Sequence, residues 1–334
     1  MTMDEKVLSS VTAFAAEHGF AIKDGEPALK KLSGGNSHVT WQGTFSGSRL
    51  VIKVAQPDGP LAPYDVGHEA RMMQLAWEGA VPAPQVVGYY QQDGEQFIVM
   101  HHVAGDAPSL WEVAKWLGDK ETEERLAIAR NFLSLLPAMH AVVLEDAETL
   151  ERHYQAYLEK LVSDLEDAAR NVITLPPTFR KARDWLIANS KLCEGVAPRL
   201  HHGDFRLGNA VFADDAVVAM LDWERAMAGH PMHDLGFLCL PGMKIGDRIC
   251  GLLSQDELHV LWPEISDEPF DLKTIGYFRI MSMFSELCYM TRAMCRLAEG
   301  RARLSGARAL PLIARLHHDL IASIIAWEND DVTL

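Results

Sequence analysis

The chain contains few cysteines and no long apolar segment. Its five cysteines include no C-x-x-C pair, the spacing typical of zinc sites and thiol redox centres, so we expect buried, reduced thiols. No apolar run approaches the roughly 18 residues that a membrane-spanning helix requires; the longest, residues 320–327, is interrupted by Ser323. The first residues lack the basic and apolar regions of a secretory signal. We therefore expect a cytoplasmic protein that does not insert into a membrane.

Basic residues are also scarce relative to acidic ones. The 31 lysines and arginines are outnumbered by 46 aspartates and glutamates, which gives a formal net charge of −15. Nonspecific binding to nucleic acid or to an anionic membrane needs a basic face, so neither partner is expected. The charge permits a cationic substrate without indicating one, because net charge is not the charge of a site. The sequence leaves the oligomeric state open.

The N-terminal third carries the patterns of a small antiparallel sheet. A helical pattern covers residues 3–19, and two alternating runs within residues 38–54 predict a hairpin around a glycine-containing turn. A second helix is predicted at residues 66–79, and two further strands at 85–90 and 96–101. We expect these elements to form an N-terminal lobe that spans residues 1–102.

The rest of the chain is dominated by helical patterns. We expect an α+β protein whose C-terminal lobe, residues 103–334, is mainly helical, with the linker between the lobes near residues 101–108. Helices are predicted at residues 120–142, 151–170, 178–192, 270–298 and 304–327, and short strands near 210–212 and 217–221.

The most informative stretch is His202-Gly203-Asp204-Phe205-Arg206-Leu207-Gly208-Asn209, which is followed by Leu221-Asp222-Trp223-Glu224. A hydroxyl that attacks a phosphate needs a carboxylate to orient it and to accept its proton, and Asp204 is the candidate. Asn209 and Asp222 offer the oxygen ligands that Mg²⁺ prefers. The spacing is that of a phosphate-transfer loop followed by a metal-binding aspartate. The alternative is that both aspartates only cap turns.

These motifs, with Gly229-His230-Pro231-Met232-His233-Asp234-Leu235-Gly236, resemble the aminoglycoside phosphotransferase and choline kinase superfamily, from about residue 30 to beyond 240. They look most like the branch that is also found fused to acyl-CoA dehydrogenases. The resemblance implies a protein-kinase-like, two-lobed fold that uses ATP and Mg²⁺ to phosphorylate the hydroxyl of a small molecule. It also implies that Asp234 accepts hydrogen bonds from the backbone of the catalytic loop.

Two N-terminal features fit this resemblance. Gly34, Gly35, Asn36 and Ser37 lie just before the hairpin, where glycines let backbone N–H groups approach phosphate oxygens; an ordinary turn is the alternative. Lys53 is flanked by apolar residues, so a buried ammonium there needs a partner or a ligand.

The resemblance gives Lys53 the role of contacting the ATP phosphates and Glu69 the role of holding Lys53 in place. Asp65 is the rival carboxylate, although it lies at the expected N-cap position of the second helix. The alternative for Lys53 is an edge-strand side chain that extends to solvent.

The strand that ends at Met100, His101 and His102 matches the nucleotide-binding hinge of the family. Adenine would pair with the backbone there, and we expect Ile52 to supply an apolar face. Arg206 would stabilise the charge of the transferring phosphate, with a surface salt bridge as the alternative.

The phosphate acceptor is the least defined feature. The closest-looking branch implies a hydroxyacyl compound, and the wider family implies aminoglycosides, choline or other amino alcohols. An alternative of another class is a nucleotide-binding regulator without catalysis. That alternative is weakened because Lys53, Asp204, Asn209 and Asp222 are all present.

Overall fold

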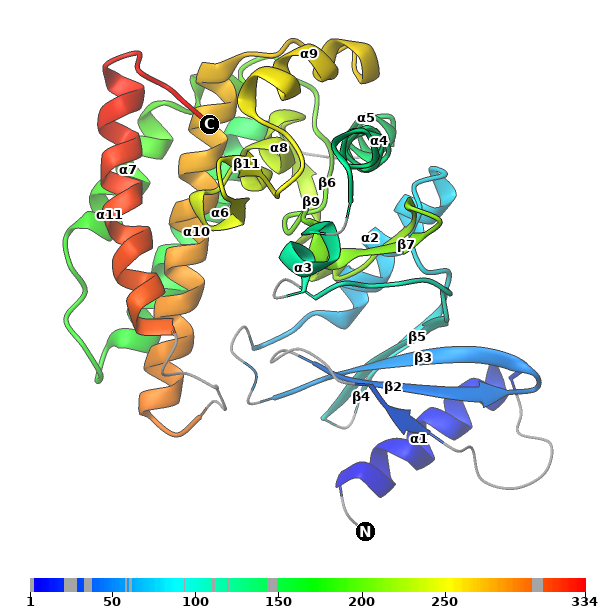
Figure 1. The fold of residues 1–334 in the computed structure, drawn as a ribbon. Coiled ribbons are helices and arrows are strands. Elements are labelled where there is room, and N and C mark those ends of the chain that lie inside the picture. Colours follow the sequence, from blue (N-terminus) through cyan, green and yellow to red (C-terminus); the bar gives the residue numbers. More distant parts are fainter. Residues whose placement is uncertain are drawn as a thin grey trace.

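The computed structural model describes residues 3–20, 29–32, 38–57, 59, 62–92, 94–109, 112–118, 120–142, 144, 149–301 and 309–334. In Figure 1 a small sheet with two helices forms one lobe, and a larger, mainly helical lobe forms the other. This confirms the predicted α+β, two-lobed architecture. The boundary at residue 102 stays a prediction.

The sheet of the smaller lobe contains five antiparallel strands in the order β1-β2-β3-β5-β4. Its centre is the predicted hairpin, whose turn residues Ser46 and Gly47 both have positive φ, as tight hairpin turns require. The helices of this lobe are α1 (Met3–Glu17) and α2 (Val66–Glu78). The strands are β1 (Lys30–Lys31), β2 (His38–Phe45), β3 (Ser48–Ala55), β4 (Val86–Gln92) and β5 (Glu95–His101).

The two faces of the sheet are covered by different helices, because successive strand side chains point to opposite faces. Ile52 and Val54 of β3 pack in one buried cluster with Phe14 of α1. Ala55, on the opposite face, packs with Ala70 of α2. Lys53 shares the face of Ala55 and therefore points toward α2 and the larger lobe.

The larger lobe is arranged around α10 (Leu272–Ala298), which contacts α6, α7, α8 and α11. It is buried along most of its length, and α11 runs beside it in Figure 1. The other helices are α3 (Val113–Gly118), α4 (Thr122–Leu133), α5 (Leu135–His140), α6 (Leu150–Ala169), α7 (Thr178–Ala188), α8 (Met232–Leu238), α9 (Gln255–Ile265) and α11 (Ala309–Glu328).

Short hairpins of this lobe carry the sequence motifs. β6 (Arg199–His201) pairs with β9 (Met227–Gly229), and β7 (Ala210–Ala213) pairs with β8 (Ala216–Met220). A further pair, β10 (Lys244–Ile245) and β11 (Arg248–Ile249), lies farther along the chain. The segment between β6 and β7 is the predicted catalytic loop.

Several helical boundaries differ from the prediction. The single helix predicted at residues 120–142 is two helices that meet at Ser134. Pro137 explains the break, since it has no N–H to continue the hydrogen-bond ladder back to Leu133. The helix predicted at 178–192 ends at Ala188 and is followed by a 3-10 turn, Ser190–Cys193. Helices α3 and α8, of 6 and 7 residues, were not predicted, because short helices give weak periodic signals. Helix α9, as long as the predicted α7, was also missed, although Ser254 and Glu257 form a capping box at its start.

The chain leaves the sheet at β5 and immediately joins the larger lobe. The N–H of Asp106 donates to the carbonyl of Phe212, and the N–H of Phe212 donates to the carbonyl of Asp106, both at 2.8 Å. Gly105 has a φ of +150°, and a Cβ there would lie 2.5 Å from the Phe212 carbonyl oxygen. The close approach of the two segments therefore requires glycine.

The structure also tests two expectations from the composition, that the thiols are buried and that no helix crosses a membrane. All five cysteines are buried free thiols, as predicted. None of the described helices is both long and apolar enough to cross a bilayer.

Candidate active site

Asp234 fixes the backbone of the catalytic loop through hydrogen bonds. Its buried carboxylate accepts hydrogen bonds from the N–H of His202 at 2.7 Å and of Gly203 at 2.9 Å. The carboxylate therefore fixes the backbone just before Asp204, which is the contact that the family resemblance implied. Burial raises the pKa of Asp234 to about 6, against the opposing effect of His202 and of these hydrogen bonds.

Gly203 allows the loop to lie against the segment that follows β8. Its φ of +81° is in the left-handed region, and a Cβ would approach the carbonyl oxygen of Arg225 to 2.3 Å. His202 braces the loop further. Its Nε2 donates to the Leu221 carbonyl at 2.9 Å, and its Nδ1 accepts from the N–H of Asp204 at 3.2 Å. A side chain at position 203 would push these two segments apart.

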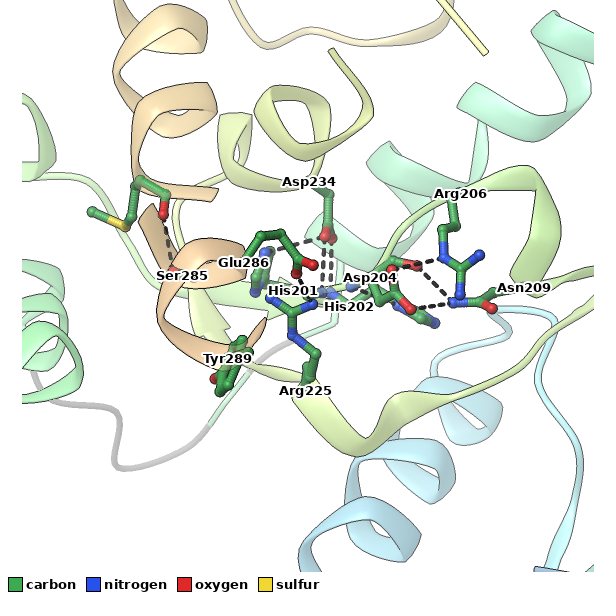
Figure 2. Close-up of polar contacts among 12 residues, drawn as sticks. His201, His202, Asp204, Arg206, Asn209, Arg225, Asp234, Ser285, Glu286 and Tyr289 are labelled. Atoms are coloured by element: carbon green, nitrogen blue, oxygen red, sulfur yellow. Dashed lines mark hydrogen bonds and ion pairs between the residues drawn. The ribbon is translucent and has the colours of Figure 1, made fainter. Parts of the chain in front are cut away.

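Both carboxylate oxygens of Asp204 accept hydrogen bonds from neighbouring side chains (Figure 2). Arg206 Nε donates to Oδ1 at 2.9 Å, and Asn209 Nδ2 donates to Oδ2 at 2.7 Å. Asn209 Nδ2 also donates to the Asp204 carbonyl at 2.9 Å. Because its nitrogen is committed to Asp204, the amide oxygen of Asn209 is the atom left for another ligand. The structure thus brings these three predicted residues together.

Asp222 is placed beside the loop by a short backbone bridge. The N–H of Leu221 donates to the Asn209 carbonyl at 2.7 Å. Asp222 itself has a φ of 61°, a left-handed conformation that is uncommon for a non-glycine residue. Its side chain is 47% exposed. The positive charge of Lys53 lowers the pKa of Asp222 to about 2.

Lys53 connects the two lobes. Its Nζ lies 2.6 Å from Glu69 Oε1 on α2 and 2.8 Å from Asp222 Oδ1 in the larger lobe. Burial lowers the pKa of Lys53, but the charges of Asp222 and Glu69 more than offset this and hold it above its usual value. The rival carboxylate, Asp65, instead caps α2 by accepting from the N–H of His68 at 2.9 Å.

A second buried cluster adjoins Lys53 and was not predicted. Ligand atoms of His38, Glu69 and Glu224 lie within 4.8 Å of one another, and His38 Nδ1 is 3.3 Å from Glu224 Oε2. Burial raises the pKa of Glu224 to about 7 and lowers that of His38 to about 3. Glu69 is already paired with Lys53, and His38 and Glu224 face each other, so we assign the cluster a supporting role. From the sequence, Glu224 was a candidate either to join the metal ligands or to support them, and this choice was left open.

The nucleotide side of the site differs from the prediction in one respect. Ile52 is fully buried in the cluster with α1, on the face opposite Lys53, and so cannot line a nucleotide pocket that contains Lys53. The expectation for Ile52 was wrong because adjacent strand residues face opposite ways. Val51 shares the Lys53 face, pairs with Met100 and is only partly buried. Gly34, Gly35, Asn36 and Ser37 lie outside the described residues.

The hinge backbone is partly engaged in the sheet. The N–H of His101 donates to Gln85 at 2.8 Å, and the N–H of His102 donates to Arg49 at 3.0 Å. Among the described residues, no backbone group pairs with the N–H of Val103, which follows directly. Val103 is therefore a better placed donor for a hinge ligand than His101 or His102, and no pattern in the sequence marked it.

The two-lobed fold, the buried Lys53–Glu69 pair and the Asp204–Asn209 loop define a protein of the protein-kinase-like class. The chain belongs to the phosphotransferase enzyme family, whose model matches residues 28–262.

Curated relatives carry similar sequences as part of longer proteins. The chain is 30% identical over 231 residues to acyl-CoA dehydrogenase family member 11 of Gallus gallus, covering 64% of this chain and 28% of that protein. It is 26% identical over 253 residues to the Homo sapiens protein of the same name, covering 69% and 30%. The chain thus spans less than a third of the length of these relatives.

Solved structures share the fold at low sequence identity. An aminoglycoside phosphotransferase candidate from Ralstonia eutropha JMP134 has a TM-score of 0.70 and 22% identity, covering 98% of this chain and 99% of that one. Aminoglycoside phosphotransferase APH(4)-Ia, solved with AMP-PNP and hygromycin B, has a TM-score of 0.61 and 15% identity, covering 94% and 98%. At these identities the likeness concerns the fold alone.

Proposed function

We propose that this protein is an ATP- and Mg²⁺-dependent phosphotransferase that phosphorylates the hydroxyl of a small molecule. The observation that carries the proposal is the convergence of Lys53, Asp204, Asn209 and Asp222 on one site between the lobes. The four residues come from β3, the catalytic loop and the segment after β8. Capping of turns, the alternative for the two aspartates, does not account for the contact of Asp222 with a buried lysine of the other lobe.

The open oxygen atoms of the site fit Mg²⁺. The Asn209 amide nitrogen is used by Asp204, which leaves its oxygen, and Asp222 has one carboxylate oxygen beyond the one that contacts Lys53. Mg²⁺ takes oxygen ligands and is commonly bound through one or two carboxylates plus substrate phosphates. When bound, the ion would neutralise negative charge on the phosphates.

The chain's own groups have distinct roles in this proposal. Lys53, held by Glu69, contacts the α- and β-phosphates, and the backbone near Val103 pairs with adenine. Asp204 orients the acceptor hydroxyl and takes its proton as the hydroxyl oxygen bonds to the γ-phosphorus and the bond to the leaving ADP oxygen breaks. Because Arg206 uses Nε for Asp204, its two terminal nitrogens are left for the transferring phosphate.

Two groups of similar proteins suggest different phosphate acceptors. The relatives that are named acyl-CoA dehydrogenase family members favour a hydroxyacyl compound. The neighbours solved with hygromycin B or gentamicin favour an aminoglycoside or amino alcohol. The presence of all four catalytic groups argues against a nucleotide-binding regulator without catalysis.

Calorimetry of ATP binding with and without Mg²⁺ tests the proposal. Mg²⁺ should strengthen ATP binding to the wild type, and Asp222→Ala should abolish that enhancement while the melting temperature shows a folded protein. Lys53 would keep Glu69 as a partner in the variant. Equal ATP affinity with and without Mg²⁺ in the wild type would contradict the metal assignment, and no ATP binding at all would refute the proposed function.

A further inference from the structure

A second polar pair lies beside the catalytic base. Figure 2 shows Asp204 between the Arg206–Asn209 side and a pair formed by Arg225 and Glu286. Arg225 Nη1 donates to Glu286 Oε1, which joins the segment after β8 to α10. Asn209 belongs to the proposed metal and nucleotide side, so we expect the acceptor to approach Asp204 from the side of the Arg225–Glu286 pair.

Arg225 is fixed in position relative to Asp204. Its backbone carbonyl is in contact with Gly203, the residue directly before Asp204. Its guanidinium lies over the ring of Tyr289, 4.7 Å from the centroid, and 5.5 Å from that of Phe237. Burial lowers the pKa of Arg225, but Glu286 and Tyr289 more than offset this, so it is held above its usual value. A guanidinium packed this tightly is an ordered group, unlike a mobile surface arginine.

The Arg225–Glu286 pair has donor and acceptor atoms that are available to a ligand. The side chains of Arg225 and Glu286 are 14% and 25% exposed. Among the described residues, none accepts a hydrogen bond from Nε or Nη2 of Arg225, and none donates to Oε2 of Glu286. A ligand that reaches the pair therefore meets N–H donors and a carboxylate acceptor side by side.

Two partly exposed carboxylates on the Arg225 side of Asp204 are already paired. Arg225 faces Glu286, and Arg292, near the Tyr289 ring, faces Asp164 at 3.1 Å. Because each of these two carboxylates already has a guanidinium, neither is free to bind an ammonium group. A polycationic acceptor would have to displace these arginines and leave them unpaired, which is unfavourable for partly buried charges.

Hydroxyl groups adjoin the pair, since the ring of Tyr289 lies beside Arg225. Tyr157 of α6 donates its hydroxyl to Ser285 Oγ at 3.1 Å and lies 3.5 Å from the hydroxyl of Tyr289. Together with the Arg225–Glu286 pair, these groups are suited to neutral oxygen functions, which both donate and accept.

We infer that Arg225 and Glu286 are the acceptor-recognition residues. They bind an uncharged oxygen group of the acceptor, either a carbonyl or a second hydroxyl, that lies next to the hydroxyl to be phosphorylated. Arg225 donates to that oxygen, and Glu286 both orients Arg225 and accepts from any hydroxyl or amide N–H of the acceptor. The inference rests on the proposed function and narrows its substrate class to acceptors without ammonium groups.

The first test compares acceptors on the wild-type protein. ADP release with ATP and Mg²⁺ is measured in the presence of hydroxybutanamide, of an aminobutanol of equal chain length, and of choline. The hydroxy amide should stimulate ADP release, and the two cationic alcohols should not. Equal or greater stimulation by the cationic alcohols would overturn the inference, as would the absence of stimulation by the amide while ATP and Mg²⁺ still bind.

The second test uses Glu286→Gln, which keeps the shape of the side chain but removes its charge. Weakening a charged hydrogen-bonded pair should raise KM for the hydroxy amide by about tenfold or more, with a smaller change in kcat and with ATP affinity within about twofold. Arg225→Lys, which keeps the charge but loses the planar fork, should behave similarly. The control is Glu264→Gln, which removes the charge of a glutamate in an exposed ion pair with Arg130.

The outcome separates this inference from the function on which it depends. An acceptor KM in Glu286→Gln and Arg225→Lys that matches the Glu264→Gln control would overturn the recognition role, even if phosphate transfer occurs. Loss of ATP–Mg²⁺ binding in the wild type would instead refute the proposed function. Circular dichroism and melting temperature establish that each variant is folded before kinetics are compared.

Discussion

Replacing Lys53 by Met should destabilise the protein, because the carboxylate of Glu69 would stay buried without its charged partner. Lys53 and Glu69 are only 6% and 1% exposed, and their charged atoms are 2.6 Å apart. Removing one partner of a buried ion pair leaves an uncompensated charge and costs roughly 3–5 kcal/mol. Asp222, the other partner, is about half exposed and keeps its hydration, so it adds little to this cost. The loss is a large part of a typical unfolding free energy of roughly 5–15 kcal/mol.

A double-mutant cycle isolates this effect. Urea unfolding is measured for Lys53→Met, Glu69→Gln and the double variant, with Lys120→Met as the control. Lys120 pairs with Asp215 at 2.6 Å, but both are partly exposed, so its loss should cost no more than about 1 kcal/mol. The double variant should recover much of the stability lost in Lys53→Met, because the neutral amide introduced by Glu69→Gln leaves no unpaired charge buried at that position.

Activity should not follow stability in this cycle. The double variant lacks the ammonium that would contact the ATP phosphates, so its turnover should stay as low as that of Lys53→Met. Glu69→Gln alone should lose less activity, because Glu69 only positions Lys53. The reasoning would be refuted if Lys53→Met were as stable as the Lys120→Met control, or if the double variant were no more stable than Lys53→Met.

Two further predictions concern other parts of the protein. Asp204→Asn should lower kcat by roughly 10²–10⁴, the usual contribution of general-base catalysis, with nearly unchanged ATP affinity; a folded and fully active variant in single-turnover kinetics would contradict the role of base. His140, whose pKa is lowered to about 4 by burial and by nearby Arg199 and His230, should make stability fall as pH drops from about 6.5 to 4, because only the unfolded chain takes up the proton. Removing that group in His140→Leu should flatten the plot of unfolding free energy against pH by about 1.4 kcal/mol per pH unit, and curves that stay parallel to the wild type would exclude this contribution.

The sequence by itself identified the parts of the site that are local in the chain. Asp204 and Asn209 lie in one tight loop, and Asp222 follows a short hairpin, so their spacing alone places them near one another. The pairing of Lys53 with Glu69 came from the family resemblance, and the local sequence only weakened the rival Asp65, which was recognisable as a helix cap. Residues separated by a loop or by one regular element have few possible arrangements.

The fold followed from the sequence less completely. Strong alternation predicted the hairpin of β2 and β3, and long periodic segments predicted α6 and α10. The single predicted helix over residues 120–142 failed at Pro137, and the short helices α3 and α8 had too few turns for a clear pattern. Helix α9 was missed although its capping box was present in the sequence. Which face of β3 meets the larger lobe could not be read from alternation alone, and Ile52 was therefore assigned to the wrong side.

Only the tertiary structure decided the contacts between distant segments. Arg225 meets Glu286 across 61 residues because Gly203 allows the two loops to touch and α10 packs behind them. His38 and Glu224 are neighbours because β2 and the segment after β8 both pack beside Lys53. Local sequence determines backbone conformation over a few residues through sterics and periodicity, whereas side chains far apart in the chain become neighbours through the packing of whole helices and sheets, which no short pattern encodes.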